Sequence, residues 1–250
     1  MTIWAYQMLV FYRKTIVFLL LIGGLILSIS NSMAGVRLSQ SRIVYMQGTK
    51  AESIAAINSG DGAYLVQSGV SASLDGQGEA PFWVMPPILR LNGQSRSLVQ
   101  IVAKPETSAL PGDRESVFYF YTNMIPSTTK PAVAGGGDTA VMKIGIKMLL
   151  KLFYRPKGLS IPASKTVDML KFTRRGNDIV VRNPTPYYAS FSSLSFDNKS
   201  VDLNNNPSMV APFGESVFHG NKIPHTIGWA LMDDYGSTTG ERHQVLSTAE

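Results

Sequence analysis

The sequence predicts an all-β fold of two β-sandwiches, and three observations support it. Short segments rich in β-branched and aromatic residues, such as Arg37 to Tyr45 and Tyr64 to Val70, recur along the chain. Turn-forming sequences such as Asn92-Gly93 separate them at roughly even intervals, which is typical of antiparallel sandwiches. Removing a predicted export signal of 34 residues from the 250 leaves 216, enough for two such domains of about 100 residues each.

The first 34 residues have the three parts of a secretory signal peptide. Two basic residues precede the apolar run Thr15 to Leu27, whose 13 residues fall short of the ~20 needed to span a bilayer. The small-residue site Ser32-Met33-Ala34 follows, so we expect cleavage after Ala34. Translation from Met8 and a retained anchor that includes Ile3 to Phe11 are the alternatives.

A domain boundary is expected within Tyr154 to Gly158, where Pro156 ends a strand ladder and Gly158 frees the chain direction. The chain then divides into a signal peptide at 1–34, a first domain at 35–156 and a second domain at 157–250. The stretch Ser127 to Thr139 contains three successive glycines and is predicted to be a loop between two strands of the first domain.

Composition excludes several functional classes. The chain contains no cysteine, which rules out disulfide scaffolds, thiolate metal sites and thiol catalysis. The formal net charge of +6 falls to +4 when the two basic residues of the signal are removed, and this excess is too small to indicate nucleic-acid binding. The three histidines, His219, His225 and His243, lack the spacing of metal ligands, so neither a metal nor another cofactor is predicted.

No catalytic constellation is predicted either. Ser127 to Lys130 matches the Ser-x-x-Lys pattern of penicillin-recognising enzymes, but it lies in the predicted loop, where no helix presents the serine. Asp233 and Asp234 are adjacent acids, yet they precede a turn glycine. We therefore expect a protein that is not an enzyme.

The segment Val141 to Arg155 has period-two alternation, so a strand would place six apolar side chains on one face. These six are Met142, Ile144, Ile146, Met148, Leu150 and Leu152. A helix is the alternative, because Lys143, Lys147 and Lys151 recur every four residues. The helix would carry Gly145 in its interior at a cost of about 1 kcal/mol, which favours the strand.

The position of this strand in its sheet has two interpretations. As an edge strand it would present unpaired N–H and C=O groups, which invite another chain to pair with it. As a central strand it would be covered by the protein's own sandwich. From the residues of the segment alone, the central position is the favoured interpretation.

Four motifs follow one another along the mature chain: Leu110 to Phe120 (LPGDRESVFYF), Lys151 to Pro156 (KLFYRP), Asn183 to Tyr188 (NPTPYY) and Asp234-Tyr235-Gly236. In this order and spacing they resemble the PapD-like periplasmic chaperones of the chaperone-usher pilus assembly pathway. The similarity runs from about Val36 to at least Gly236, nearly the whole mature chain.

The resemblance implies two immunoglobulin-like β-sandwich domains set at an angle, a cleft between them and no catalytic reaction. In the family, the last strand of the first domain lends alternating apolar residues to a pilus subunit that lacks its own final strand. The donor positions on this sequence are Met142, Ile144 and Ile146, with Met148 and Leu150 continuing the row.

The resemblance also implies two groups of charged residues. The two cleft cations that hold the subunit's terminal carboxylate in the family match Arg42 and Lys151. Arginine offers a planar fork for both carboxylate oxygens, lysine adds a point charge, and fixing the last residue would set the register of the added strand. Glu115, Arg155 and Asp234 are expected to form a charge network across the domain junction that orients the domains.

The sequence departs from the family pattern at three places. Gln100 stands where a further basic member of the network is expected, and Tyr121 stands where asparagine is usual. The loop Ser127 to Thr139 is longer than in short-loop members, yet the cysteine pair typical of long-loop members is absent. These departures leave the subfamily open.

The resemblance therefore implies a periplasmic chaperone that binds and stabilises pilus or fimbrial subunits by donor-strand complementation and delivers them to an outer-membrane usher. Its partners would be the subunits and the usher, with neither nucleic acid nor membrane insertion after signal cleavage. A second copy of the chain is a candidate for capping the free edge when no subunit is bound. The alternative function is that of a structural or adhesive β-sandwich protein exported to the cell surface.

Overall fold

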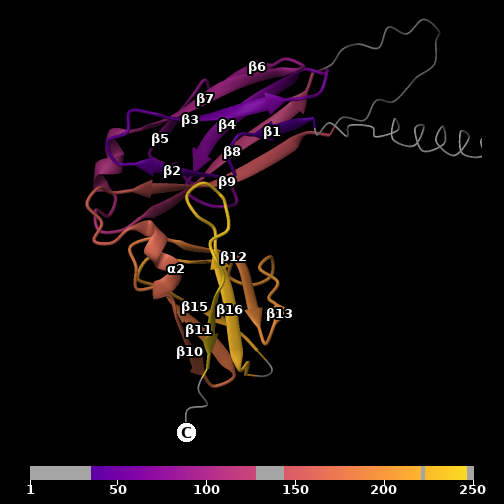
Figure 1. Ribbon diagram of the computed structural model, residues 1–250. Coiled ribbons are helices and arrows are strands. Elements are labelled where there is room, and N and C mark those ends of the chain that lie inside the picture. Colours follow the sequence, from indigo (N-terminus) through magenta and orange to yellow (C-terminus); the bar gives the residue numbers. More distant parts are fainter. Residues whose placement is uncertain (1–34, 128–143, 221–222, 247–250) are drawn as a thin grey trace, which may run out of the picture. The chain divides into compact units, whose positions relative to one another are not determined.

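The computed structural model describes residues 35–127, 144–220 and 223–246, which form mainly strands (Figure 1). The predicted signal peptide, the donor position Met142 and nearly all of the predicted loop Ser127 to Thr139 lie outside the described residues. Within the described ranges, no helix is long and apolar enough to cross a membrane. The all-β class that the sequence predicts is confirmed.

Two sheets form the first sandwich. One sheet has the order β1 (Val36–Leu38), β3 (Glu52–Asn58), β7 (Ser95–Ala103) and β5 (Phe82–Met85). The other has the order β2 (Arg42–Met46), β9 (Ile146–Arg155), β8 (Ser116–Pro126), β4 (Tyr64–Ser71) and β6 (Ile88–Leu91). A short 3₁₀ turn, η1 (Pro105–Ala109), lies between β7 and β8 in the chain.

Aromatic and aliphatic side chains from alternate positions of both sheets fill the core of the first sandwich. The ring of Phe82 meets those of Tyr45 and Phe118 edge to face, with centroids 5.4 and 5.3 Å away. Leu152 and Tyr154 of β9 belong to the same cluster. The C-terminal half of β9 is therefore part of the protein's own core.

The second sandwich follows two short turns, η2 (Ala163–Lys165) and α2 (Thr166–Met169). One sheet has the order β10 (Lys171–Arg175), β11 (Asp178–Arg182) and β15 (Glu215–Phe218). The other has the order β13 (Lys199–Ser200), β12 (Ala189–Phe196), β16 (Thr226–Leu231) and β17 (Arg242–Val245), with β14 (Met209–Val210) also paired to β12. Trp229 packs in this core, where the centroid of its ring lies 4.6 Å from that of the Phe172 ring. Its indole N–H donates to the Val167 carbonyl at 3.0 Å.

The prediction of one continuous strand from Arg37 to Tyr45 is wrong. The chain changes sheets inside this segment, because β1 pairs antiparallel with β3 whereas β2 pairs parallel with β9. Ser39 ends the first pairing: its N–H donates to the Ala55 carbonyl at 2.9 Å, and its hydroxyl accepts from the Ala55 N–H at 3.0 Å. This switch brings Arg42 beside β9.

The segment Val141 to Arg155 is described from Ile144 and is a strand from Ile146 onward. β9 spans Ile146–Arg155, so the strand prediction is confirmed over that range and the helical alternative is wrong there. The two interpretations of its position are each correct for one half. Residues 151–155 lie between β2 and β8, whereas residues 146–150 pair with β8 and with no other strand that the structure describes (Figure 1).

Candidate functional site

Among the described strands, the N-terminal half of β9 has a hydrogen-bonded neighbour on one side only. Its residues from Ile146 onward pair antiparallel with β8, but the parallel pairing with β2 begins at Lys151. Of the described strands, no other one pairs with residues 146–150. The backbone N–H and C=O groups on that side are therefore available to an added strand.

The apolar row of β9 becomes more exposed toward its N-terminal end. Leu152 is fully buried, Ile146 is 39% exposed, and Ile144, just before the strand, is 67% exposed. Met148 and Leu150 lie between them, partly buried against the edges of two core clusters. The row thus passes from the protein's own core into solvent, and apolar side chains along an open strand edge indicate a binding partner.

Arg42 and Lys151 lie directly opposite each other, because they are the first paired residues of β2 and β9. The Nη1 group of Arg42 donates to the carbonyls of Met232 and Asp233 at 2.7 and 2.9 Å. Its guanidinium lies 5.0 Å from the centroid of the Phe153 ring. Its Nε group is buried and has no hydrogen-bond partner in the part of the chain that the structure describes. The arginine is thus fixed in place with donor capacity left over.

Burial lowers the pKa of both cations. For Arg42 the nearby carboxylates, led by Asp234, oppose the effect of burial. For Lys151 the charge of Arg42 lowers the pKa further, and no carboxylate offsets it. Two adjacent, partly desolvated cations are stabilised by an incoming anion, so this pair is suited to bind a carboxylate.

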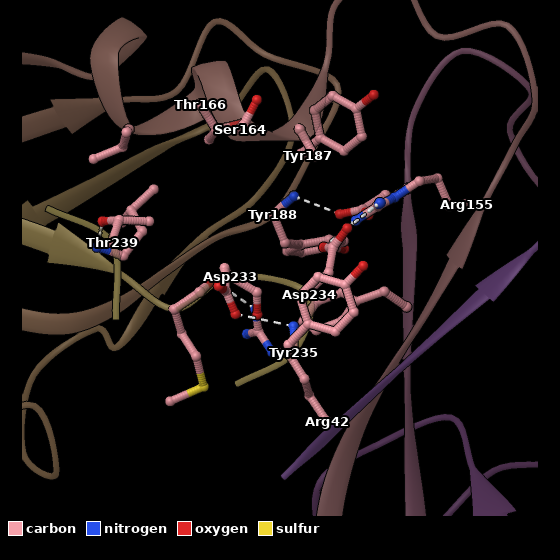
Figure 2. Close-up of a pocket in the computed structure, with 16 residues that line it drawn as sticks. Arg42, Arg155, Ser164, Thr166, Tyr187, Tyr188, Asp233, Asp234, Tyr235 and Thr239 are labelled. Carbon is pink, nitrogen blue, oxygen red and sulfur yellow. Dashed lines mark hydrogen bonds and ion pairs between the residues drawn. The ribbon is translucent and has the colours of Figure 1, made fainter. Parts of the chain in front are cut away.

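A cavity of about 250 Å³ lies beside Arg42 and is lined by residues of both sandwiches. Phe153 and Arg155 line it from β9, and Tyr187 lines it from the second sandwich. Figure 2 shows Arg155 and Asp234 directed toward each other in this cavity. The cavity therefore combines aromatic surfaces with paired charges.

Arg155 bridges acids from the two sandwiches. Its Nε donates to Glu115 Oε1 at 2.7 Å, and its Nη1 and Nη2 groups donate to the two carboxylate oxygens of Asp234 at 2.6 Å each (Figure 2). The second oxygen of Glu115 accepts from the Tyr188 N–H at 2.8 Å. The structure thus brings together the three residues of the predicted charge network.

The protonation equilibria of this network reflect its burial. Burial raises the pKa of Glu115, although the charge of Arg155 opposes that change. Burial alone would lower the pKa of Arg155, but hydrogen bonds and charges from Asp234 and Glu115 raise it above its ordinary value. Arg155 therefore stays charged and holds both acids.

Comparison with known families matches residues 35–160 to the N-terminal domain of PapD, described as a pili and flagellar-assembly chaperone. Residues 165–243 match the C-terminal domain of the pili assembly chaperone PapD. Chaperone protein FocC of Escherichia coli is 32% identical over 221 residues, which cover 87% of this chain and 93% of FocC.

Two solved structures are similar over nearly their whole length. The periplasmic chaperone SfaE is 30% identical, with 85% of this chain and 100% of SfaE covered and a TM-score of 0.70. The SafB chaperone, solved in complex with the Salmonella enterica SafA pilin, gives a match with 27% identity, coverage of 87% and 99%, and a TM-score of 0.74.

This chain belongs to the PapD family of periplasmic pilus-assembly chaperones. The resemblance that the four sequence motifs indicate is therefore confirmed, together with the two-domain immunoglobulin-like fold and the chaperone class of function.

The sequence motifs contain the three residues of the charge network. The sequence also indicates that one expected basic member is missing, because Gln100 stands in its place. Gln100 lies on β7 opposite Ser53 and Met85, on a different sheet from Arg155. No hydrogen bond among the described residues joins Gln100 to the charge network. The network therefore contains one cation, Arg155, rather than two.

Two features of the junction were missed by sequence reasoning. The carbonyls of Met232 and Asp233 hold Arg42, but a carbonyl leaves no mark in the side-chain pattern. Gly236, with φ +84°, packs so closely on Ser41 that a Cβ would stand 3.3 Å from the Ser41 Cβ and closer still to its hydroxyl. The motif Asp234-Tyr235-Gly236 was the available signal for the contact with Ser41, because a glycine in a turn often lets another segment approach its backbone closely.

The histidines lie away from this site in separate surroundings. His219 faces Asp178 at 3.1 Å and His243 faces Glu241 at 3.7 Å, with both imidazoles largely exposed. In the described ranges, no group of three or more potential metal ligands occurs.

Proposed function

We propose that this chaperone binds pilus or fimbrial subunits in the periplasm by adding residues 144–150 to them as a strand, and then delivers them to an outer-membrane usher. The one-sided pairing of residues 146–150 is the observation that carries the proposal. The similarity to SafB, solved in complex with a pilin, supports the class of partner. Binding through a free strand edge supplies main-chain hydrogen bonds for affinity and side-chain pockets for specificity.

The position of Arg42 sets the direction of the added strand. β2 runs parallel to β9 and starts at Arg42, beside Lys151. A strand that continues the line of β2 along residues 144–150 brings its C-terminal carboxylate to these cations only if it also runs parallel to β9. An antiparallel strand would bring its terminal ammonium group there instead. We therefore propose a parallel added strand whose last residue is held by Arg42 and Lys151.

The apolar row supplies the contacts within the subunit. Ile144, Ile146, Met148 and Leu150 lie on one side of the donor segment, and Met142 would extend this row beyond the described residues. Fully burying one such side chain contributes about 1.5–3 kcal/mol. Because side chains alternate, a slip by one residue would turn the whole row away from the subunit, so the carboxylate anchor protects the register.

The network of Glu115, Arg155 and Asp234 is proposed to keep the two domains in a fixed relation around the anchor. Arg155 ends β9 and holds Asp234, which follows directly on the Asp233 carbonyl that holds Arg42. The anchor and the network thus share one loop of the second sandwich. We place the boundary between the domains after residue 156, at the end of β9.

Binding without catalysis is the proposed chemistry of the cavity. Its acids Glu115 and Asp234 are occupied by Arg155, so they are not poised as a general acid and base. The same free edge would also accept a second copy of the chain when no subunit is present.

Co-expression with a pilus subunit that lacks its final strand tests the proposal. The mature protein should keep that subunit soluble, and Lys151→Ala should weaken capture by about 2–5 kcal/mol, which is at least thirtyfold. If the wild-type protein leaves subunit solubility unchanged, the proposal fails and a structural or adhesive function is favoured.

A charge placed in the donor row tests the edge separately from the anchor. Ile146→Asp should prevent capture, because the subunit would have to bury an unpaired carboxylate. Val245→Asp is the matched control, since Val245 is also an exposed strand residue, on β17 of the second sandwich. Equal loss of capture in both variants would contradict the assignment of the donor edge.

A further inference from the structure

On the face of the sheet opposite the apolar row, the donor segment contacts Tyr121 of β8 through Lys147. Tyr121 of β8 lies between Leu149 of β9 and Gly69 of β4 in the register of the sheet. All three residues therefore lie on the outer face of this sheet, which is the face opposite the apolar row of β9. The sequence resemblance leads to the expectation of asparagine at this position, and this chain has Tyr121 there.

The Tyr121 ring lies directly on the backbone of Gly69. A Cβ at position 69 would stand 2.9 Å from Cε1 of the ring and closer still to Cζ and the hydroxyl. Glycine is therefore required for the ring to occupy this place, as when an aromatic side chain covers a glycine on a neighbouring strand. The ring leans toward β4 and away from β9.

Lys147 of the donor segment extends over this ring. Its ammonium lies 5.9 Å from the ring centroid and 3.6 Å from where a Cβ of Gly76 would stand. Gly76 belongs to the loop between β4 and β5, so the Lys147 side chain crosses the outer face of β8. Ser73 chiefly lowers the pKa of Asp75 in this loop, and the charge of Lys147 adds to the effect.

We propose that Tyr121, seated on Gly69, is a positioning residue that holds the donor segment extended through Lys147 before a subunit arrives. The inference rests on the proposed function. Among the described strands, residues 146–150 have a backbone partner on one side only, so contacts of their outer face add to what keeps them in strand geometry. A preformed strand loses less conformational entropy on binding than a disordered one.

Hydrogen exchange of the free mature protein tests the bracing without any subunit. In Tyr121→Ala, the protected amides of residues 146–150 should exchange about fivefold faster, as expected for loss of a cation–π contact and a cross-strand pair. Gly69→Ala should have a similar effect because the methyl group displaces the ring. In the double variant, residues 146–150 should exchange no faster than in Tyr121→Ala, because the methyl group added at position 69 then meets no ring.

Two further variants separate bracing from general stability. Tyr121→Phe keeps the ring and should behave as wild type, and so should Trp83→Ala, which removes a half-exposed ring from the other sheet. Lys147→Gln removes the exposed cation from the ring and should reproduce the faster exchange. Unchanged exchange in both Tyr121→Ala and Lys147→Gln would overturn the proposal, as would faster exchange in Trp83→Ala.

The rate of subunit capture completes the test. Tyr121→Ala and Lys147→Gln should capture a subunit about fivefold more slowly than wild type, in line with their exchange rates. Equal capture rates alongside faster exchange would overturn the positioning role while leaving strand donation intact. If the wild-type protein captures no subunit at all, the proposed function fails, and the positioning role fails with it.

Discussion

Residues 146–150 and 151–155 of β9 share one strand and one alternating pattern but have different surroundings. The second half lies between β2 and β8 and buries Leu152 completely, whereas the first half pairs, within the described part of the chain, with β8 alone and leaves Ile146 39% exposed. The difference arises because β2 starts only at Arg42, beside Lys151. The extent of a neighbouring strand, rather than the composition of β9, decides which half is core and which is open edge.

The two halves also divide the tasks of binding. The buried half fixes the strand in the protein's own core and carries Lys151, which we propose receives the subunit's carboxylate, and Arg155, which we propose orients the two domains. The open half continues the same strand direction and offers backbone groups with apolar side chains. Such a strand is largely preformed, which lowers the cost of association.

Arg155→Ala should have the largest effect on the buried half. It would leave Glu115, whose side chain is 2% exposed, as an uncompensated acid, and breaking a buried ion pair costs about 3–5 kcal/mol. Urea unfolding of the mature protein measures this loss. Arg175→Ala is the control, because its pair with Glu215 is exposed and such pairs are worth about 0–1 kcal/mol. Similar losses in the two variants would contradict the buried character of the network.

Leu152→Ala should cost about 2–5 kcal/mol of unfolding free energy, because it opens a cavity in a fully buried part of the core. Ile146→Ala truncates the same row six residues earlier, and should cost less than about 1 kcal/mol because the side chain is 39% exposed. Chemical unfolding of both variants compares the halves directly. If Ile146→Ala is as costly as Leu152→Ala, residues 146–150 belong to the protein's own core.

The pattern along β9 was readable from sequence because it depends on local alternation. Period two indicated the strand and its apolar row, and the interior Gly145 counted against a helix. The division of the strand at Lys151 was not readable, because it depends on where β2 begins. Hydrophobic periodicity does not tell to which sheet a strand belongs, so the change of sheets before Arg42 was missed.

Other misses have equally specific causes. β3 was not predicted because Ala55 and Ala56 have low strand propensity, although both are almost completely buried. Arg42 and Lys151 were predicted from the family resemblance and not from their residue types, since isolated strand charges are usually solvated. Their adjacency is a product of parallel pairing between segments more than 100 residues apart.

Capture should depend on pH through Lys151, on the border between the two halves. Burial and Arg42 lower the pKa of this ammonium, so it loses its proton below the ordinary lysine value of about 10.4. A bound carboxylate favours the protonated form, so affinity should be greatest below the lowered pKa and fall by at most about tenfold per pH unit as the pH rises through it.

Lys151→Arg removes this dependence if the prediction is correct, because arginine stays protonated throughout the range. The Kd for a subunit, measured from neutral to alkaline pH for both proteins, compares the two. A parallel loss of affinity in the arginine variant would assign the effect to another group or to unfolding.

Ile144→Asp should have the smallest effect on stability while abolishing capture. Ile144 precedes β9 and is 67% exposed, so its replacement should change the free energy of unfolding by no more than about 0.5 kcal/mol. Leu150→Asp is the matched change on the same row, and it should be clearly destabilising because Leu150 packs against the core of the first sandwich. Thermal unfolding and subunit capture of both variants locate the point along the row where core ends and donor begins. A large loss of stability in Ile144→Asp would mean that the Ile144 side chain packs in this protein's own core. The apolar row would then not be available to bind a subunit.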